Sequence, residues 1–416
     1  MAAKAGDAPW SADRVARLRA GLAKAGLDGF VLPRADEHQG EYVPKSSERL
    51  FWLTGFTGSA GMAIVLADKA AIFVDGRYTL QVTQQVDGRL FEYQHLTEQP
   101  PHDWLAKTAK AGARIGFDPW LHTVDGLARL RAAARDAGAE LVAVADNPVD
   151  AAWTDRPARP IAPVVPHPAQ FSGRSFAEKA ALVAERLAAE RAGAAVVSAP
   201  DSIAWLLNVR GGDVPRTPLP LSFAIVAASG DVDWYVDPRK LHPDLRAHLG
   251  NRVQVRAPDA LGDALDALGR AKARVLIDGA TAAIWIAERL EAAGAAVLRG
   301  QDPCALPKAC KTEGELTHVR ASHLRDGAAL TRFLHWIATE GPKGTISELD
   351  AVAQLLALRR QGEHFRDTSF DTISGAGPNG AIVHYRSTEA TNRRLAPDML
   401  YLVDSGGQYL DGTTDV

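Results

Sequence analysis

Apolar residues recur at helical spacing close to the start of the chain. Val15, Leu18 and Leu22 lie on one face of a helix, Ser11 precedes them as a candidate N-cap, and Gly26 follows as a stop signal. The pattern therefore predicts an amphipathic helix between Ser11 and Gly26.

Short apolar runs and further helical patterns alternate over the next hundred residues. The runs predict strands at 30–33, 62–66 and 71–74, and the periodic segments predict helices at 78–86, around Trp104 and at 124–137. Alternating strands and helices are typical of an α/β domain.

Three apolar motifs of this region return in the same order later in the chain. Their offsets are 153, 161 and 162 residues: Phe51-Trp52-Leu53 with Ala204-Trp205-Leu206, Ala63-Ile64-Val65 with Ala224-Ile225-Val226, and Phe73-Val74-Asp75-Gly76-Arg77 with Tyr235-Val236-Asp237-Pro238-Arg239. Three ordered matches indicate a duplicated α/β domain. The proline-rich stretch 156–168 is the predicted linker between the two copies.

A region of different character opens near Pro307. Thr312 with Glu315, and later Ser347 with Asp350, have the spacing of capping boxes at the starts of two long helices. Strand-like runs at 369–374, 381–385, 399–403 and 407–410 follow. Helices followed by hairpins predict an α+β domain, unlike the two domains before it.

Composition excludes several classes of protein. Lys plus Arg is 47 and Asp plus Glu is 50, so the net charge of -3 lacks the basic surplus of a nucleic-acid binder. The two cysteines, Cys304 and Cys310, are too few for a disulfide framework. No leader-like or membrane-length apolar run is present, so we expect no membrane association and a cytoplasmic location.

Two aspartates flank a predicted tight turn near the end of the sequence. Asp404 ends an apolar strand, Asp411-Gly412 is a turn dipeptide, and Asp415 begins the next segment. Adjacent carboxylates repel unless a proton or a cation lies between them, so the pair is a candidate site for Mn²⁺ or Mg²⁺. The spacing equally allows two turn residues on a solvated hairpin, and both interpretations stay open.

A glycine-rich loop and a histidine lie upstream of these aspartates. His384 follows the apolar run of the predicted strand 381–385, where an imidazole can contact a substrate carbonyl or serve as an ordinary core residue. The loop 374–380 lacks the GxxxxGK[ST] pattern of a phosphate-binding loop.

The motifs taken together resemble those of the Xaa-Pro aminopeptidases, in their long three-domain form. The resemblance rests on residues 36–42 (DEHQGEY), 55–61 (GFTGSAG), 75–78 (DGRY), 370–385, 391–393 and 404–415. It implies two related creatinase-N-terminal-like α/β domains, at 1–155 and 156–306, before a "pita-bread" metallopeptidase domain that starts at 307 and is incomplete at 416.

The resemblance also implies roles for individual residues. Asp404 matches a metal-binding aspartate, and Asp415 matches the aspartate that bridges two Mn²⁺ ions. His384 matches a catalytic, substrate-contacting histidine. Arg77 matches a peptide-binding arginine of the first domain, although a structural ion pair after a strand explains Arg77 equally well from sequence alone. The family further implies two-metal hydrolysis of the bond before proline, peptide substrates with N-terminal Xaa-Pro, and a homodimer.

The family pattern continues past the second aspartate to a metal-binding histidine and two glutamates, expected after residue 416. The chain is therefore expected to be a C-terminally truncated and inactive form. Two rival functions remain: a prolidase or creatinase-like hydrolase on the same fold, or a catalytically dead pita-bread protein used for binding.

Overall fold

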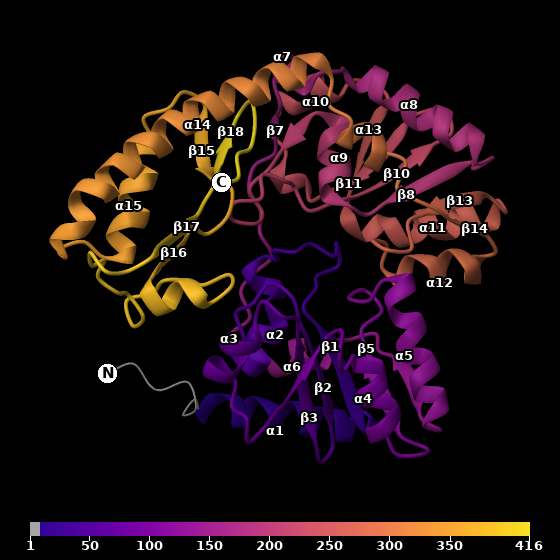
Figure 1. The fold of residues 1–416 in the computed structure, drawn as a ribbon. Coiled ribbons are helices and arrows are strands. Elements are labelled where there is room, and N and C mark those ends of the chain that lie inside the picture. Colours follow the sequence, from indigo (N-terminus) through magenta and orange to yellow (C-terminus); the bar gives the residue numbers. More distant parts are fainter. Residues whose placement is uncertain (1–8) are drawn as a thin grey trace. The chain divides into compact units, whose positions relative to one another are not determined.

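The computed structural model describes residues 9–416, which divide into two compact units. The N-terminal unit runs to Pro166 and includes Ser175–Ala309, and the C-terminal unit comprises His167–Arg174 with Cys310–Val416. Figure 1 labels the helices and strands of both units.

The first half of the N-terminal unit is a six-stranded mixed sheet with helices around it (Figure 1). Its elements are α1 (Pro9–Lys24), β1 (Gly29–Pro33), η2 (Lys45–Ser47), α2 (Arg49–Thr54), β2 (Met62–Leu66), β3 (Ala70–Val74), α3 (Thr79–Gln85), β4 (Glu92–His95), α4 (Pro101–Thr108), β5 (Arg114–Phe117), α5 (Val124–Asp136), β6 (Glu140–Ala143) and α6 (Pro148–Ala152). The strand order is β4-β3-β2-β1-β5-β6, in which β1, β2 and β3 are antiparallel and the outer pairs are parallel.

The second half repeats this arrangement. Its elements are β7 (Val165–Pro166), α8 (Phe176–Ala189), β8 (Ala194–Val197), α9 (Pro200–Leu207), β9 (Val209–Arg210), β10 (Phe223–Ala227), β11 (Val232–Tyr235), η3 (Pro238–Lys240), α10 (Leu245–Leu249), β12 (Val253–Arg256), η4 (Pro258–Ala260), α11 (Leu261–Arg270), β13 (Arg274–Ile277), α12 (Ile284–Ala293), β14 (Ala296–Arg299) and α13 (Ala305–Ala309). The strand order β12-β11-β10-β8-β13-β14 has the same parallel and antiparallel neighbours. The predicted duplication is confirmed.

The two sheets share one hydrophobic core. A single buried cluster contains Ile64 and Phe73 of the first sheet together with Ile225 and Ile277 of the second. At the junction the rings of Trp120 and Trp285 stack 4.1 Å apart, and the Ile284 amide donates to the His122 carbonyl at 2.8 Å. Burial of this shared apolar surface holds the two domains together as one compact unit.

The C-terminal unit packs two helices against short hairpins. Its elements are α7 (Ala169–Ser172), α14 (Glu313–Glu340), η5 (Gly341–Lys343), α15 (Glu348–Arg359), β15 (Phe365–Thr368), β16 (Ile373–Ala376), η6 (Gly377–Ala381), β17 (Tyr401–Asp404) and β18 (Gly407–Tyr409). β16 pairs with β17 and β15 pairs with β18, both antiparallel. Both predicted capping boxes are present, at Thr312–Glu315 and Ser347–Asp350.

Three local predictions are wrong. The predicted strand 369–374 lies mostly between β15 and β16, and only residues 373 and 374 belong to a strand. Ser11 lies inside α1, which begins two residues earlier at Pro9, a residue favoured in the first helical turn. The predicted strand 381–385 is instead the end of η6 and a turn, in which Val383 is exposed and His384 has a φ of 55°. The residues of the apolar run at 381–383 therefore do not enter a sheet.

Candidate active site

Asp404 and Asp415 are positioned by a tight antiparallel hairpin. Ser405 and Val416 exchange both backbone hydrogen bonds at 3.0 and 2.9 Å, Thr414 donates to the Gly407 carbonyl, and Tyr409 donates to the Gly412 carbonyl. The three contacts share one register, in which residue 406 faces residue 415. Side chains alternate between the two faces of a strand, so Asp404 projects from the same face as residue 406 and its partner Asp415. The two aspartates are thus diagonal neighbours on one face of the hairpin.

Nothing bulky separates these two carboxylates, because the residue directly opposite Asp415 is Gly406. Asp404 is half-buried and Asp415 is exposed. Burial raises the pKa of the Asp404 carboxyl, the negative charge of Asp415 raises it further, and His384 opposes both effects. Asp415 and His384 therefore both lie close enough to Asp404 for their charges to act on its carboxyl group.

His384 lies in the loop after η6, and that loop is fixed by one buried carboxylate. Glu348, the first residue of α15, is fully buried; it accepts hydrogen bonds from the Ala376 amide at 2.7 Å, Asn379 Nδ2 at 2.8 Å and the Tyr385 hydroxyl at 3.0 Å. The Arg393 amide donates to the same carboxylate at 3.1 Å, so four donors compensate the cost of burying the charge. The loop that carries His384 is thereby held against α15.

The turn of the Asp404–Asp415 hairpin is fixed to α14. Arg325 NH2 contacts both carboxylate oxygens of the buried Asp411, at 2.5 and 2.6 Å. The guanidinium also lies over the Tyr409 ring, 5.6 Å from its centroid. Asp411 is therefore a structural turn residue with an ion-pair partner.

Arg77 lies in the N-terminal unit, directly after β3. Its Nε and NH2 donate to the Asp75 carboxylate at 3.1 and 2.8 Å, and Glu41 lies 3.7 Å from NH1. Hydrogen bonding to Asp75 raises the pKa of the guanidinium, so Arg77 is a permanent cation. Tyr78 stacks beside it, 5.1 Å from the guanidinium carbon, with its hydroxyl 2.8 Å from Ser59 Oγ.

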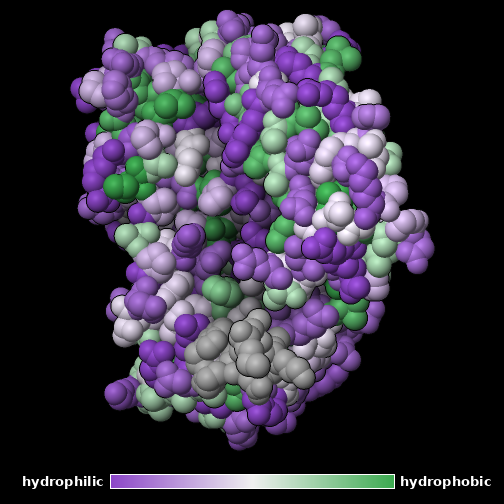
Figure 2. Space-filling view, turned by 90° about the vertical axis from the view of Figure 1, so that its left-hand side faces the viewer, coloured by the Kyte–Doolittle hydropathy of each residue, from purple (hydrophilic) through white to green (hydrophobic). Residues whose placement is uncertain are grey.

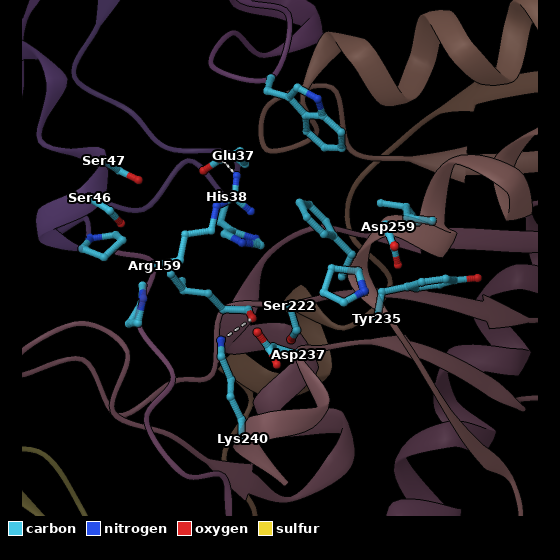
Figure 3. A pocket seen from close by; sticks show the side chains of 17 residues that line it. Glu37, His38, Ser46, Ser47, Arg159, Ser222, Tyr235, Asp237, Lys240 and Asp259 are labelled. Carbon is cyan, nitrogen blue, oxygen red and sulfur yellow. Dashed lines mark hydrogen bonds and ion pairs between the residues drawn. The ribbon is translucent and has the colours of Figure 1, made fainter. Parts of the chain in front are cut away.

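The N-terminal unit also has a cavity between its two sheets, shown in Figure 3, of about 390 Å³. Trp120, Phe223 and Tyr235 supply its aromatic wall, and an ion pair of 3.0 Å joins Glu37 and Arg159 at its side. None of the site residues predicted from sequence lines this cavity.

The donor set around Asp404 suits a hard divalent cation. Two carboxylates on one rigid face offer oxygen ligands, which Mn²⁺ and Mg²⁺ prefer. Within residues 9–416, no group of three or more His, Cys, Asp or Glu side chains is arranged to hold a metal ion. Residues 9–416 therefore supply two carboxylate ligands, Asp404 and Asp415, to a candidate metal site.

Comparison with known proteins assigns each domain of the chain to a family. Residues 14–151 and 155–315 each match a Creatinase/Prolidase N-terminal domain, and residues 317–416 match Metallopeptidase family M24. A probable Xaa-Pro aminopeptidase P from Paracoccidioides brasiliensis is 36% identical over 97% of this chain and 68% of its own length. The corresponding protein from Aspergillus clavatus is 38% identical over 98% of this chain and 63% of its own length.

The crystal structure of X-prolyl aminopeptidase from Caenorhabditis elegans, described as a cytosolic enzyme with a di-nuclear active site, superposes with a TM-score of 0.91. It is 31% identical, and the alignment covers 98% of this chain and 69% of that one. The chain belongs to the Xaa-Pro aminopeptidase family.

Family membership confirms the predicted fold class of two creatinase-type N-terminal domains followed by a metallopeptidase domain. The chain spans roughly two thirds of the length of these Xaa-Pro aminopeptidases, 63% in the Aspergillus clavatus relative. No helix among residues 9–416 has the length and apolar character needed to cross a membrane. The face of the molecule drawn in Figure 2 is mostly hydrophilic, with scattered apolar residues.

Sequence reasoning missed the buried charges of this Xaa-Pro aminopeptidase domain. Glu348, Asp326 and Arg359 are at most 1% exposed, although helical charges are ordinarily solvated. The available signal was their position on the apolar faces of their helices: Asp326 is one turn before Ala329, and Arg359 follows Leu355 and Leu358.

Proposed function

We propose that the protein is a metal-dependent aminopeptidase that releases the N-terminal residue from peptides with proline in the second position. The observation that carries this proposal is that Asp404 and Asp415 project from one face of the hairpin and that His384 lies close enough to Asp404 for its charge to act on that carboxyl group. Membership of the Xaa-Pro aminopeptidase family supports it.

In this proposal Asp404 and Asp415 are metal ligands, with Asp415 bridging two ions, and Mn²⁺ is the proposed metal. When bound, the cations would supply Lewis-acid polarisation of the scissile carbonyl and activation of water. The proposed role of His384 is to donate a hydrogen bond to the reacting carbonyl oxygen as negative charge develops there.

Arg77 has a separate role in this proposal. As a permanent cation held by Asp75, it would bind the peptide without taking part in proton transfer. Its fixed guanidinium suits carbonyl or carboxylate oxygens, which accept paired N–H groups.

Three finer points are also proposed, the first two of them from the family likeness alone. We propose a cytoplasmic location, as described for the Caenorhabditis elegans enzyme, and a homodimeric assembly. Domain boundaries after residues 155 and 306 are proposed from the linker composition and the start of the capped helix at Thr312.

Specificity is tested with the full-length protein by following Arg-Pro-Pro and Arg-Ala-Ala by mass spectrometry. We expect release of arginine from the first peptide and little from the second. Equal cleavage of both peptides would refute proline specificity. Hydrolysis confined to dipeptides would support a prolidase instead, and Mn²⁺-loaded protein that cleaves neither would support a binding protein.

A further inference from the structure

A buried ion pair lies beneath the hairpin that carries Asp404 and Asp415. Asp326 of α14 and Arg359 at the end of α15 have side chains 1% and 0% exposed. The Arg359 Nε and NH2 groups donate to the two Asp326 oxygens at 2.7 and 3.1 Å. Burial acts to raise the pKa of Asp326, but hydrogen bonds from Arg359, Tyr409 and Thr414 outweigh it and keep the pKa below its usual value.

Among the described residues, the other side-chain hydrogen bonds of this pair go to the hairpin. The Thr414 hydroxyl donates to Asp326 Oδ2 at 3.0 Å, and the Tyr409 hydroxyl donates to Oδ1 at 2.8 Å. Arg359 NH1 donates to the Gly406 carbonyl at 3.3 Å. In Figure 1 β18 and the end of the chain lie beside α14, consistent with these contacts.

Two of these contacts lie next to the candidate metal ligands. Thr414 immediately precedes Asp415, and Gly406 follows Asp404 by two residues and faces Asp415 across the hairpin. Thr414 Oγ1 also accepts a hydrogen bond from the Gly407 amide at 2.9 Å, so one hydroxyl joins both strands to the buried carboxylate. The ion pair thus fixes both strands at the positions where their aspartates project.

The packing around these contacts leaves little room for adjustment. A Cβ atom on Gly406 would lie 2.0 Å from Ser369 Oγ and 2.1 Å from the Thr414 carbonyl oxygen. A slip of one residue in the hairpin would move Asp415 to the opposite face from Asp404. The register therefore decides whether the two carboxylates can serve one site.

Stability alone is a poor explanation for such a pair. Replacing a buried ion pair with well-packed apolar residues is often neutral or stabilising, because desolvation offsets the attraction between the charges. Groups that orient metal ligands from behind, in contrast, commonly change metal affinity by about 10–100-fold when they are removed.

We propose that Asp326, Arg359 and Thr414 are positioning residues that fix the relative placement of the Asp404 and Asp415 carboxylates and so set the affinity of the site for divalent cations. This inference rests on the proposed metal-binding role of the two aspartates. It assigns a function in the metal site to residues that do not touch the metal.

The test is a pair of matched substitutions in the full-length protein. Thr414→Val removes the hydroxyl that joins both strands to Asp326 and keeps the shape of the side chain. Tyr409→Phe removes a hydrogen bond to the same carboxylate but leaves the contacts to Thr414 and Gly406 intact. Mn²⁺ affinity is measured by titration calorimetry, Mn²⁺ spectra by electron paramagnetic resonance, and stability by urea denaturation.

We expect Thr414→Val to weaken Mn²⁺ binding by about tenfold or more and to alter the Mn²⁺ spectrum. Thr414→Ser keeps the hydroxyl group, so its Mn²⁺ affinity and Mn²⁺ spectrum should be those of the wild type. Tyr409→Phe should lower the denaturation midpoint while leaving Mn²⁺ affinity within about twofold of wild type. Asp326→Asn gives a second test, with the expectation of weakened Mn²⁺ binding, should Thr414→Val fail to fold.

A purely structural role would give a different result. In that case Thr414→Val and Tyr409→Phe would lower the midpoint alike and both would bind Mn²⁺ as wild type does, which overturns the inference. Wild-type protein that binds no Mn²⁺ would overturn both the inference and the metal assignment. Wild-type protein that binds Mn²⁺ but does not cleave Arg-Pro-Pro would overturn the proposed activity alone.

Discussion

The buried His122 predicts how the stability of the N-terminal unit depends on pH. Its side chain is 4% exposed in the loop before α5, and the Phe117 ring packs edge-on at 5.7 Å. Nε2 has no hydrogen-bond partner within the described part of the chain. Burial lowers the pKa of His122 to about 4, against a weaker opposing hydrogen bond involving the Val31 backbone. The imidazole is therefore neutral in the folded protein at physiological pH.

The sign of the pH dependence follows from the two pKa values. In the unfolded chain a histidine titrates near pH 6.5, above the folded value of about 4, so the unfolded state binds the extra proton first. The contribution of the neutral His122 to the free energy of unfolding is fully present above about pH 6.5. It is lost as the pH decreases toward 4. The difference between pKa values of 6.5 and about 4 corresponds to about 3 kcal/mol of stability in total, of which about 2 kcal/mol is lost by pH 5.

The perturbation is His122→Asn, which keeps a donor near the Val31 carbonyl and removes the titrating ring. Urea denaturation at pH 8 and pH 5 is followed by tryptophan fluorescence. Of the nine tryptophans, Trp336 is the one in the C-terminal unit, so the signal comes mainly from the N-terminal unit. We expect the wild type to lose about 2 kcal/mol more than His122→Asn between these pH values.

The comparison uses differences within each protein, so a general loss of stability in His122→Asn does not affect it. His242→Asn, at an exposed position of the same unit, should keep the wild-type pH dependence. Parallel pH dependences of wild type and His122→Asn would show that the buried histidine does not carry this effect and would refute the reasoning.

Three further predictions concern the candidate site in the full-length protein. His384→Ala should lower kcat by about two to four orders of magnitude with metal content unchanged, and normal turnover would return His384 to a structural role. Arg77→Ala should raise KM with little change in kcat, whereas Arg239→Ala should leave both constants unchanged. Equal changes in KM for the two variants would exclude a specific role for Arg77. Gly406→Ala should lower the free energy of unfolding by about 1–3 kcal/mol or more. Gly327→Ala on α14 is the control and should not, because a Cβ at that position meets no atom within 4 Å. A Gly406→Ala protein as stable as the wild type in thermal unfolding would contradict the packing argument.

Features with local signals were predictable from the sequence. Both capping boxes follow from residues three apart, and the duplicated domain follows from motifs that recur in order. The hairpin of Asp404 and Asp415 follows from an apolar strand and a turn. Such signals act within a few residues, so the sequence carries them without knowledge of the tertiary structure.

Features that depend on distant partners were not predictable. The run at 381–383 has the composition of a strand, but the loop is held in place by Glu348, more than thirty positions earlier in the sequence. Asp326 and Arg359 have the charges of solvated helix residues, and their burial becomes evident only with the hairpin packed over them. Tertiary hydrogen bonds outweigh local propensity in both cases.

The duplication also bears on how Arg77 should be interpreted. Arg77 donates through its amide and Nε to Asp75 at 3.0 and 3.1 Å. Arg239 makes the same contacts with Asp237 at 3.0 and 3.0 Å in the second domain. Because both copies keep this contact, it belongs to the turn that ends the third sheet strand, and it is no evidence of peptide binding.

The surroundings of the two arginines differ. Beside Arg77 stands Tyr78, whose hydroxyl lies 2.8 Å from Ser59 Oγ. The residue after Arg239 is Lys240, which is 5% exposed and held in a buried ion pair. A function of Arg77 in peptide binding would therefore depend on these neighbours and on Glu41, which lies 3.7 Å from its NH1. In the second domain, the position after the arginine holds a charged residue folded into the interior. Both substitutions, Arg77→Ala and Arg239→Ala, remove the same contact with the aspartate two residues earlier. A difference between their effects on KM therefore reports the surroundings in which the two arginines differ.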